Sequence, residues 1–233
     1  SLAYAIYTSG STGQPKGVTV AHGALAEHCE GVWRHYGLVP GDHVLQFASL
    51  SFDTSLEQML PTLMAGAMVI MRGEEVWPPG ELSRQMREGG VTVANLVPVY
   101  WQQLLQEWAA RPEEAPRALR LVIVGGDVLP PEAVRLWWQT AGRTARLLNA
   151  YGPTEVTVTA ATFEVLPPVV NEASGLRVPI GRPLANRTMY ILDRYGNPVP
   201  VGVAGELYIG GAGLAQGYLR RPELTAERFV EGR

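Results

Sequence analysis

The chain has 233 residues, of which 46% are hydrophobic and 18% charged, with a formal net charge of −3. This is typical of a soluble globular protein of one or two domains, and the lack of a basic field argues against nucleic acid as a partner. A single cysteine, Cys29, excludes an internal disulfide, and the longest apolar run, Leu63–Met71, is too short to span a bilayer. We therefore expect a cytoplasmic protein that does not bind a membrane.

Two strand-like segments, Leu2–Tyr7 and Val18–Val20, flank a loop rich in glycine and hydroxyl groups. Such a loop brings backbone N–H groups and O–H donors close to a ligand, and Lys16 adds a mobile positive charge. The pattern indicates a polyphosphate site. It is not a Walker loop, because Pro15 and Gly17 flank the lysine. The alternative is a flexible linker, which the flanking strands disfavour.

Short apolar segments then alternate with amphipathic ones. The predicted strands are Val44–Ser49, Ala67–Met71, Val91–Val97, Leu119–Val124 and Ala145–Ala150, and the predicted helices are His22–Tyr36, Leu56–Met64, Glu81–Glu88, Tyr100–Ala110 and Pro131–Thr140. This alternation predicts an α/β fold, in which a three-layer parallel sheet is flanked by helices.

The pattern changes after residue 160. Apolar segments at Thr162–Val170, Met189–Asp193, Gly205–Ile209 and Leu214–Tyr218 are separated by proline and glycine turns, and a helix is predicted over Pro222–Phe229. These features predict an antiparallel segment that forms part of a β-barrel.

Polar or glycine-rich turns follow four of the parallel strands, at 49–55, 95–98, 124–127 and 149–155. Ligands of open parallel sheets bind beyond the carboxyl ends of the strands. We therefore expect these four turns to form one site.

Four motifs carry a resemblance to a known family: YTSGSTGQPKGV (7–18), LSFDTSLEQ (50–58), NAYGPTE (149–155) and GELYIGGAGLAQGYLRRPELTAERF (205–229). In this order they resemble the adenylation domain of nonribosomal peptide synthetases, within the adenylate-forming superfamily, whose large subdomain has a flavodoxin-like part. Members are longer, so we expect an internal piece of the large N-terminal subdomain, inactive or weakly active alone. The expected division is a phosphate-binding segment at 1–20, a parallel α/β subdomain at 21–160 and a partial barrel at 161–233, with the C-terminal lid subdomain absent.

The resemblance implies a two-step reaction. A carboxylate attacks the α-phosphorus of Mg·ATP, giving an acyl-adenylate and pyrophosphate, and the acyl group then passes to the phosphopantetheine thiol of a carrier protein. The implied cofactors are ATP or AMP and Mg²⁺. The implied partners are an amino acid, a peptidyl carrier protein domain and a neighbouring condensation domain.

The resemblance also assigns roles. Tyr151 would stack on adenine with Gly126 on the other face, Asn149 would bind the adenine amino group, Thr154 would touch the α-phosphate and Glu155 would hold Mg²⁺. The residues implied to act on the phosphates are Thr8, Lys16, Thr154 and Glu155. The full nucleotide set is Thr8, Ser9, Gly10, Ser11, Thr12, Gly13, Lys16, Gly126, Asn149, Ala150, Tyr151, Gly152 and Thr154.

Asp53 would pair with the substrate α-ammonium. It could instead be a helix N-cap, and both roles can hold at once, because a cap position also lies at the carboxyl edge of the sheet. The nine pocket positions implied by the resemblance are Asp53, Thr54, Glu57, Asn95, Ile123, Gly125, Ala150, Val158 and Thr159. A carboxylate at Glu57 would favour a basic or polar substrate side chain, or it could be a solvated helix residue. The alternatives to amino-acid activation are an acyl- or aryl-CoA ligase of the same superfamily and a nucleotide-binding fragment without turnover.

Overall fold

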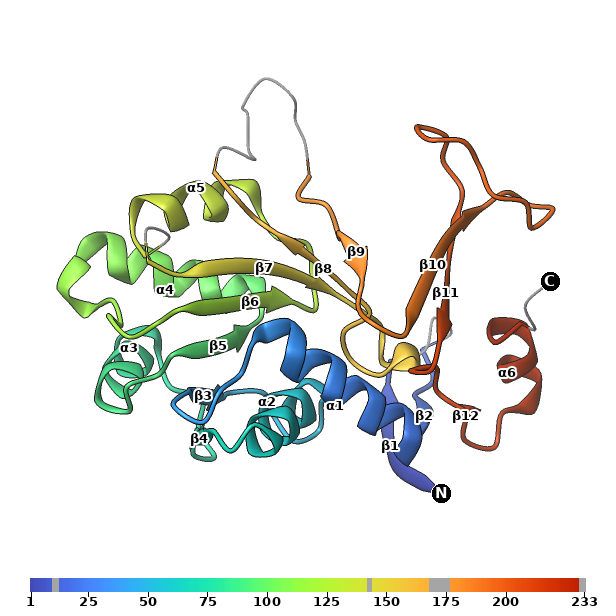
Figure 1. The fold of residues 1–233 in the computed structure, drawn as a ribbon, viewed down its shortest axis with the longest axis horizontal. Coiled ribbons are helices and arrows are strands. Elements are labelled where there is room, and N and C mark those ends of the chain that lie inside the picture. Colours follow the sequence, from blue (N-terminus) through green and yellow to red (C-terminus); the bar gives the residue numbers. More distant parts are fainter. Residues whose placement is uncertain (10–12, 142–143, 168–176, 231–233) are drawn as a thin grey trace.

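A seven-stranded sheet with the order β4-β3-β5-β6-β7-β8-β9 forms the centre of the computed structural model, which describes residues 1–9, 13–141, 144–167 and 177–230 (Figure 1). The strands from β4 to β7 are parallel, and β8 and β9 are antiparallel to their neighbours. The bounds are β3 (His43–Gln46), β4 (Met68–Met71), β5 (Val93–Leu96), β6 (Leu121–Gly125), β7 (Arg146–Tyr151), β8 (Ala161–Glu164) and β9 (Arg182–Pro183). The predicted parallel sheet is confirmed.

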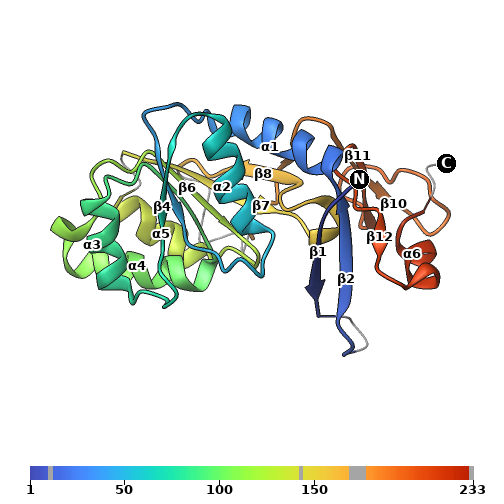
Figure 2. The ribbon, with the colours of Figure 1, turned by 90° about the horizontal axis from the view of Figure 1, so that it is seen from below.

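Helices cover both faces of this sheet. One face carries α1 (His22–Tyr36) and α2 (Thr54–Met64), and the other carries α3 (Pro79–Glu88), α4 (Pro98–Ala110) and α5 (Pro131–Gln139), as Figure 2 shows. Successive strand side chains point to opposite faces. Val122 and Val124 of β6 therefore pack in the α3–α5 core, whereas Leu121 and Ile123 pack in the α1–α2 core. This explains why the predicted strands are continuous apolar runs.

Helix boundaries follow local chemistry. Gly37 adopts the left-handed conformation, with φ of 57°, directly after α1, and its N–H bonds the carbonyl of Arg34. That cap ends the helix at the predicted residue. Proline occupies the first turn of α3, α4 and α5, where an N–H has no partner inside the helix. No helix formed by the described residues is long and apolar enough to cross a membrane.

The N-terminal segment forms a hairpin of β1 (Leu2–Thr8) and β2 (Lys16–Ala21), with Thr8 paired to Lys16. The strand β12 (Gly217–Tyr218) adds to the other edge of β2. The helix α6 (Pro222–Arg228) packs beside β12 (Figure 1). The first and last parts of the chain therefore form one small sheet.

The strands after residue 160 pair antiparallel, as predicted, but they are divided among three sheets. The strands β8 and β9 extend the large sheet, β10 (Arg187–Leu192) and β11 (Glu206–Gly211) form a separate hairpin, and β12 joins the N-terminal hairpin. An antiparallel β8 covers the backbone edge that β7 would otherwise expose. Residues 168–170 of the predicted strand Thr162–Val170 lie outside the described residues.

Candidate functional site

Pocket positions on neighbouring strands are brought together by the register of the parallel sheet. Asn95 of β5 is the partner of Ile123 in β6, and Gly125 of β6 is the partner of Ala150 in β7. A Cβ at Gly125 would lie 2.8 Å from the carbonyl oxygen of Ala150. Only glycine fits this close approach, so the glycine has a packing reason to be there.

The turn after β7 is strained. Gly152 has no room for a side chain, because a Cβ would lie 1.9 Å from the carbonyl oxygen of Val158. The short helix η2 (Thr154–Val156) follows, and both Thr157 and Val158 then adopt positive φ, at 59° and 62°. That conformation is unfavourable for β-branched residues and is typical of sites where the surrounding structure holds a functional turn.

Asp53 lies directly before α2, beside this turn. Asp53 occupies the N-cap position of α2 without a side-chain capping hydrogen bond, and the backbone N–H of Thr54 acts to lower its pKa. The residue is 8% exposed, and its Oδ2 has no hydrogen-bond partner. Burial raises the pKa of Asp53, a hydrogen bond with Thr154 lowers it, and the charge of Glu57 raises it further. The structure thus places Asp53 against the 149–155 segment.

Glu57 is buried in a hydrogen-bonded network. Its carboxylate accepts bonds from Nε2 of His28 at 2.9 Å, from the hydroxyl of Tyr36 at 2.9 Å and from Nδ2 of Asn95 at 3.1 Å. Thr159 also acts to lower the pKa of Glu57. Burial alone would raise the pKa of Glu57, but these bonds, that of His28 foremost, hold the pKa below its ordinary value. Glu57 is therefore neither solvated nor unpaired.

His28 and Tyr36 are site candidates that the sequence motifs do not mark. Both lie on α1, eight residues apart, and both are at most 3% exposed. Residues at this spacing share one helix face, so two polar residues on the buried face of α1 are the signal that could have found them.

The predicted phosphate loop joins β1 to β2. Thr8 ends β1, and its buried hydroxyl oxygen has no hydrogen-bond partner. Gly13 has φ of 80°, as a glycine-dependent turn requires. Ser9 is exposed, whereas Gly10, Ser11 and Thr12 lie outside the described residues.

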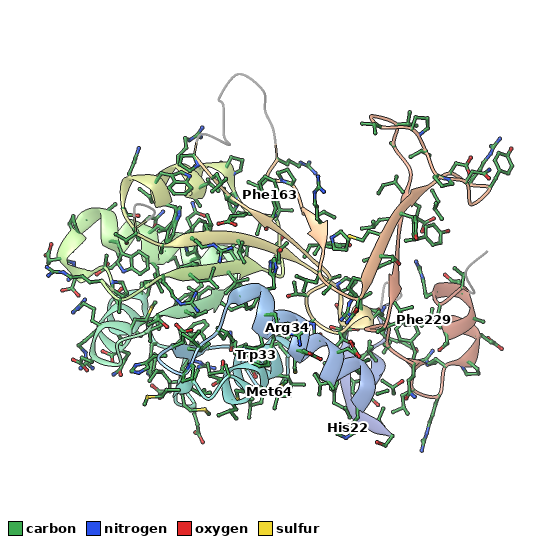
Figure 3. The ribbon with its side chains drawn as sticks, in the orientation of Figure 1. His22, Trp33, Arg34, Met64, Phe163 and Phe229 are labelled. Carbon is green, nitrogen blue, oxygen red and sulfur yellow. The ribbon has the colours of Figure 1, made fainter. Side chains whose placement is uncertain are left out.

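Lys16 connects this hairpin to η2. Its Nζ lies 2.5 Å from Oε1 of Glu155 and 3.0 Å from the hydroxyl of Tyr218, which in turn donates to Glu155 at 2.7 Å. Burial disfavours the charges, yet these contacts raise the pKa of Lys16 and lower that of Glu155. Phe229, labelled in Figure 3, packs edge-on against the Tyr218 ring at 5.6 Å between centroids. The ion pair of Lys16 and Glu155 therefore joins β2, η2 and β12, which are far apart in the sequence.

The predicted adenine residues lie at the carboxyl ends of β6 and β7. Asn149 is 5% exposed, and its Nδ2 donates to the carbonyl oxygen of Pro179 at 2.7 Å. That bond leaves Oδ1 as the atom able to accept from an amino group. Tyr151 is partly exposed, and Gly126 is exposed with φ of 88°.

Glu155 suits a magnesium ion chemically. Mg²⁺ prefers hard oxygen ligands and is commonly held by one or two carboxylates together with substrate phosphates. The lowered pKa keeps the Glu155 carboxylate ionised. Within the described ranges no group of three or more His, Cys, Asp or Glu could hold a metal by itself. The Glu155 carboxylate therefore fits a Mg²⁺ ion whose other ligands include phosphate oxygens.

These features define an α/β protein whose polar and glycine-rich turns meet at the carboxyl edge of a parallel sheet. Residues 1–219 match the model of the family described as AMP-binding enzyme. The chain belongs to this family, and the resemblance predicted from its four motifs is confirmed.

Among the relatives, the chain is 42% identical over 230 residues, 98% of its length, to bacitracin synthase 3 of Bacillus licheniformis. A crystal structure of the nonribosomal peptide synthetase FmoA3 in an alpha-methyl-L-serine-AMP bound form matches with a TM-score of 0.90 and 33% identity over 98% of this chain. Holo-PA1221, described as containing adenylation and PCP domains, matches with a TM-score of 0.87 and 28% identity over 99% of this chain. The chain spans 3%, 25% and 39% of these three proteins, respectively.

Proposed function

We propose that this chain is part of an amino-acid-activating enzyme that converts ATP and an amino acid into aminoacyl-AMP and pyrophosphate. The observation that carries this proposal is the unpaired Oδ2 of Asp53, which is buried beside Thr154. A buried carboxylate oxygen without a partner is unfavourable, and a substrate ammonium would supply the missing bond. An acid without an α-amine would leave that oxygen unpaired, which disfavours an acyl- or aryl-CoA ligase.

The nucleotide would bind along the strand ends, with its adenine near Tyr151, Gly126 and Asn149. Its phosphates would lie between the loop after Thr8 and the start of η2. Lys16 and Glu155 would then exchange their mutual contact for a phosphate oxygen and Mg²⁺. The ion would stabilise negative charge on the phosphates. Thr8 and Lys16 would hold the β- and γ-phosphates, and Thr154 would touch the α-phosphate, which the substrate carboxylate attacks.

The partners are proposed from the same relatives. Holo-PA1221 combines adenylation and PCP domains, which supports a phosphopantetheine-bearing carrier as the acceptor of the aminoacyl group. We place the protein in a cytoplasmic assembly line for peptides, next to a condensation domain. Within it, 1–20 would hold phosphate and 21–160 would hold the amino acid and adenine.

The test is amino-acid-dependent exchange of pyrophosphate into ATP by the complete protein. Replacing Asp53 by Asn should lower kcat/KM for the amino acid roughly 10- to 150-fold, since a charge-assisted hydrogen bond contributes about 1.5–3 kcal/mol. The matched control is Asp193→Asn, because Asp193 is an exposed turn residue that caps N–H groups of Tyr195 and Asn197. Equal exchange by D53N and D193N, or faster exchange with a des-amino acid, would contradict the proposal.

A further inference from the structure

Arg187 is a buried cation at the base of the β10–β11 hairpin, which stands apart from the large sheet (Figure 1). The residue is 6% exposed, and its Nε has no hydrogen-bond partner among the described residues. Its Nη2 donates to the carbonyl oxygen of Val156, the last residue of η2, at 3.3 Å. Burial lowers the pKa of Arg187, but a guanidinium stays protonated in proteins. A positive charge is therefore held against the end of η2.

The surroundings of Arg187 offset little of the unfavourable burial of its charge. The charge of Glu27 raises the pKa of Arg187, but Oε2 of Glu27 accepts a hydrogen bond from Nδ2 of Asn186 at 2.6 Å. A buried guanidinium with an unpaired N–H generally contributes less to stability than an apolar side chain of similar volume. The stability of the fold alone therefore does not explain an arginine at this position.

Gly213 provides the space that the guanidinium occupies. A Cβ at residue 213 would lie 1.7 Å from Cζ and 1.8 Å from Nη2 of Arg187, so that a side chain there would displace the guanidinium. Gly213 is not among the described glycines with positive φ. Its lack of a side chain is therefore required by the guanidinium and not by the backbone conformation. The guanidinium packs directly on the backbone of residue 213.

The segment that begins at Gly213 also binds η2 and the residue after it. The hydroxyl of Thr157 donates to the carbonyl oxygen of Gly213 at 2.8 Å, and the N–H of Ala215 donates to the carbonyl oxygen of Glu155 at 2.8 Å. Together with the guanidinium bond described above, these contacts hold every residue from 155 to 157. Thr157 has φ of 59°, a strained conformation that persists only where neighbouring contacts impose it. These bonds therefore fix the backbone that carries Glu155.

We propose that Arg187 is a positioning residue, which holds η2 in the conformation that lets Thr154 and Glu155 bind the phosphates and Mg²⁺ of ATP. This inference rests on the nucleotide site of the proposed function. The guanidinium acts through η2 and does not contact the nucleotide, since it packs on Gly213 and on the carbonyl of Val156. A displacement of about 1 Å in an element that positions a substrate can lower activity about 100-fold. Loss of the guanidinium should therefore weaken the use of Mg·ATP.

Arg187→Met in the complete protein tests this role, because methionine fills much of the volume without the donors and should leave the melting temperature close to that of the wild type. In pyrophosphate exchange, the KM for ATP and the Mg²⁺ concentration for half-maximal rate should each rise about tenfold. The KM for the amino acid should change less than about twofold, since Asp53 lies on α2. Calorimetric titration with ATP and Mg²⁺ should show the same tenfold weakening without turnover.

Arg146→Met is the matched control for this substitution. Arg146 begins β7, at the end of the strand opposite Tyr151, and forms an exposed ion pair with Glu164. Its replacement should change neither KM, because it has no contact with η2.

Gly213→Ala tests the packing of the guanidinium. The added methyl group should displace the Arg187 side chain and raise the KM for ATP about as much as Arg187→Met does. After Arg187→Ala has emptied the space, the same glycine substitution should have little further effect, so the two changes should not be additive. Guanidinium ion at millimolar concentration should restore ATP binding in part to R187A but not to the double variant. Gly41→Ala is the control, since a Cβ at Gly41 meets nothing within 4 Å.

The outcomes separate this inference from the proposed function. An unchanged KM for ATP in folded R187M, or additive effects of R187A and G213A, would overturn the positioning role. An equal rise in the KM for ATP and for the amino acid would also overturn it, because that result indicates a general loss of structure. If no amino acid supported exchange by the wild type, amino-acid activation alone would fail, and calorimetry would still compare ATP binding by R187M and the wild type. A wild type that binds no ATP would overturn both.

Discussion

The two ends of the site differ in how their buried polar atoms are paired. The Glu57 carboxylate has hydrogen-bond donors from α1 and β5, and its pKa is lowered. Four residues earlier, Asp53 keeps an unpaired Oδ2 and its pKa is raised, and Thr8 keeps an unpaired hydroxyl. A buried carboxylate whose oxygens are both paired stabilises the fold, whereas unpaired buried atoms are unfavourable unless a ligand completes them. The comparison separates the scaffold from the surface that binds substrate.

The largest expected effect concerns the scaffold. Replacing Glu57 by Ala should lower the free energy of unfolding by roughly 3–5 kcal/mol, because several buried donors lose their acceptor at once. Urea unfolding followed by the fluorescence of the buried Trp101, Trp108 and Trp137 measures it. Glu88→Ala on the exposed face of α3 is the control, with an expected change within about 0.5 kcal/mol. If Glu57→Ala lowered the free energy of unfolding by less than about 1 kcal/mol, the contrast between the paired Glu57 and the unpaired Asp53 would not hold.

A smaller effect of opposite sign is expected at Asp53. Burial raises the folded-state pKa of this carboxyl above its ordinary value of 3.8, so ionisation destabilises the fold. Below the unfolded pKa both states are protonated and no penalty exists. The penalty grows as pH rises through the folded pKa and is complete above it. Asp53→Asn should therefore match the wild type near pH 3.5 and be more stable, by on the order of 1 kcal/mol, at pH 7.

Urea midpoints across this pH range check the prediction. Glu57 should show the opposite pH dependence, because its folded-state pKa is lowered. The stability that Glu57 contributes is present above the ordinary pKa of 4.5 and is lost as pH falls through the folded-state pKa. If D53N were less stable than the wild type at neutral pH, Oδ2 would have a partner that the fold already supplies.

Local patterns in the sequence were sufficient for the parallel sheet and its helices. The helix α1 was predicted with its observed ends from its amphipathic pattern, and the structure adds that the left-handed backbone of Gly37 stops the helix. Strand pairing over long separations was not predictable in this way. The contact of β12 with β2 pairs Gly217 with Thr19, which are 198 positions apart, and no periodicity encodes it.

The site shows the same limit. Asp53 and the 149–155 segment were expected to meet, because the carboxyl ends of parallel strands share one edge. The partners of Glu57 were not expected, since a sequence shows which polar residues lie on a helix but not which neighbours saturate them once buried. His28 and Tyr36 come from an element that the motifs do not include.

The smallest expected effect lies at the nucleotide end, where Lys16 and Glu155 form a pair that nucleotide binding would have to separate. Their side chains are 24% and 20% exposed. A pair with this exposure contributes little, so a double-mutant cycle of Lys16→Met and Glu155→Gln without nucleotide should give a coupling of about 0.5–1 kcal/mol. Raising the salt concentration to about 1 M should weaken this coupling, because screening acts on charges that water reaches. A coupling above about 2 kcal/mol that salt does not change would show that this pair is part of the scaffold, as the Glu57 network is. Separating Lys16 from Glu155, as proposed for the binding of ATP and Mg²⁺, would then be too unfavourable to accompany substrate binding.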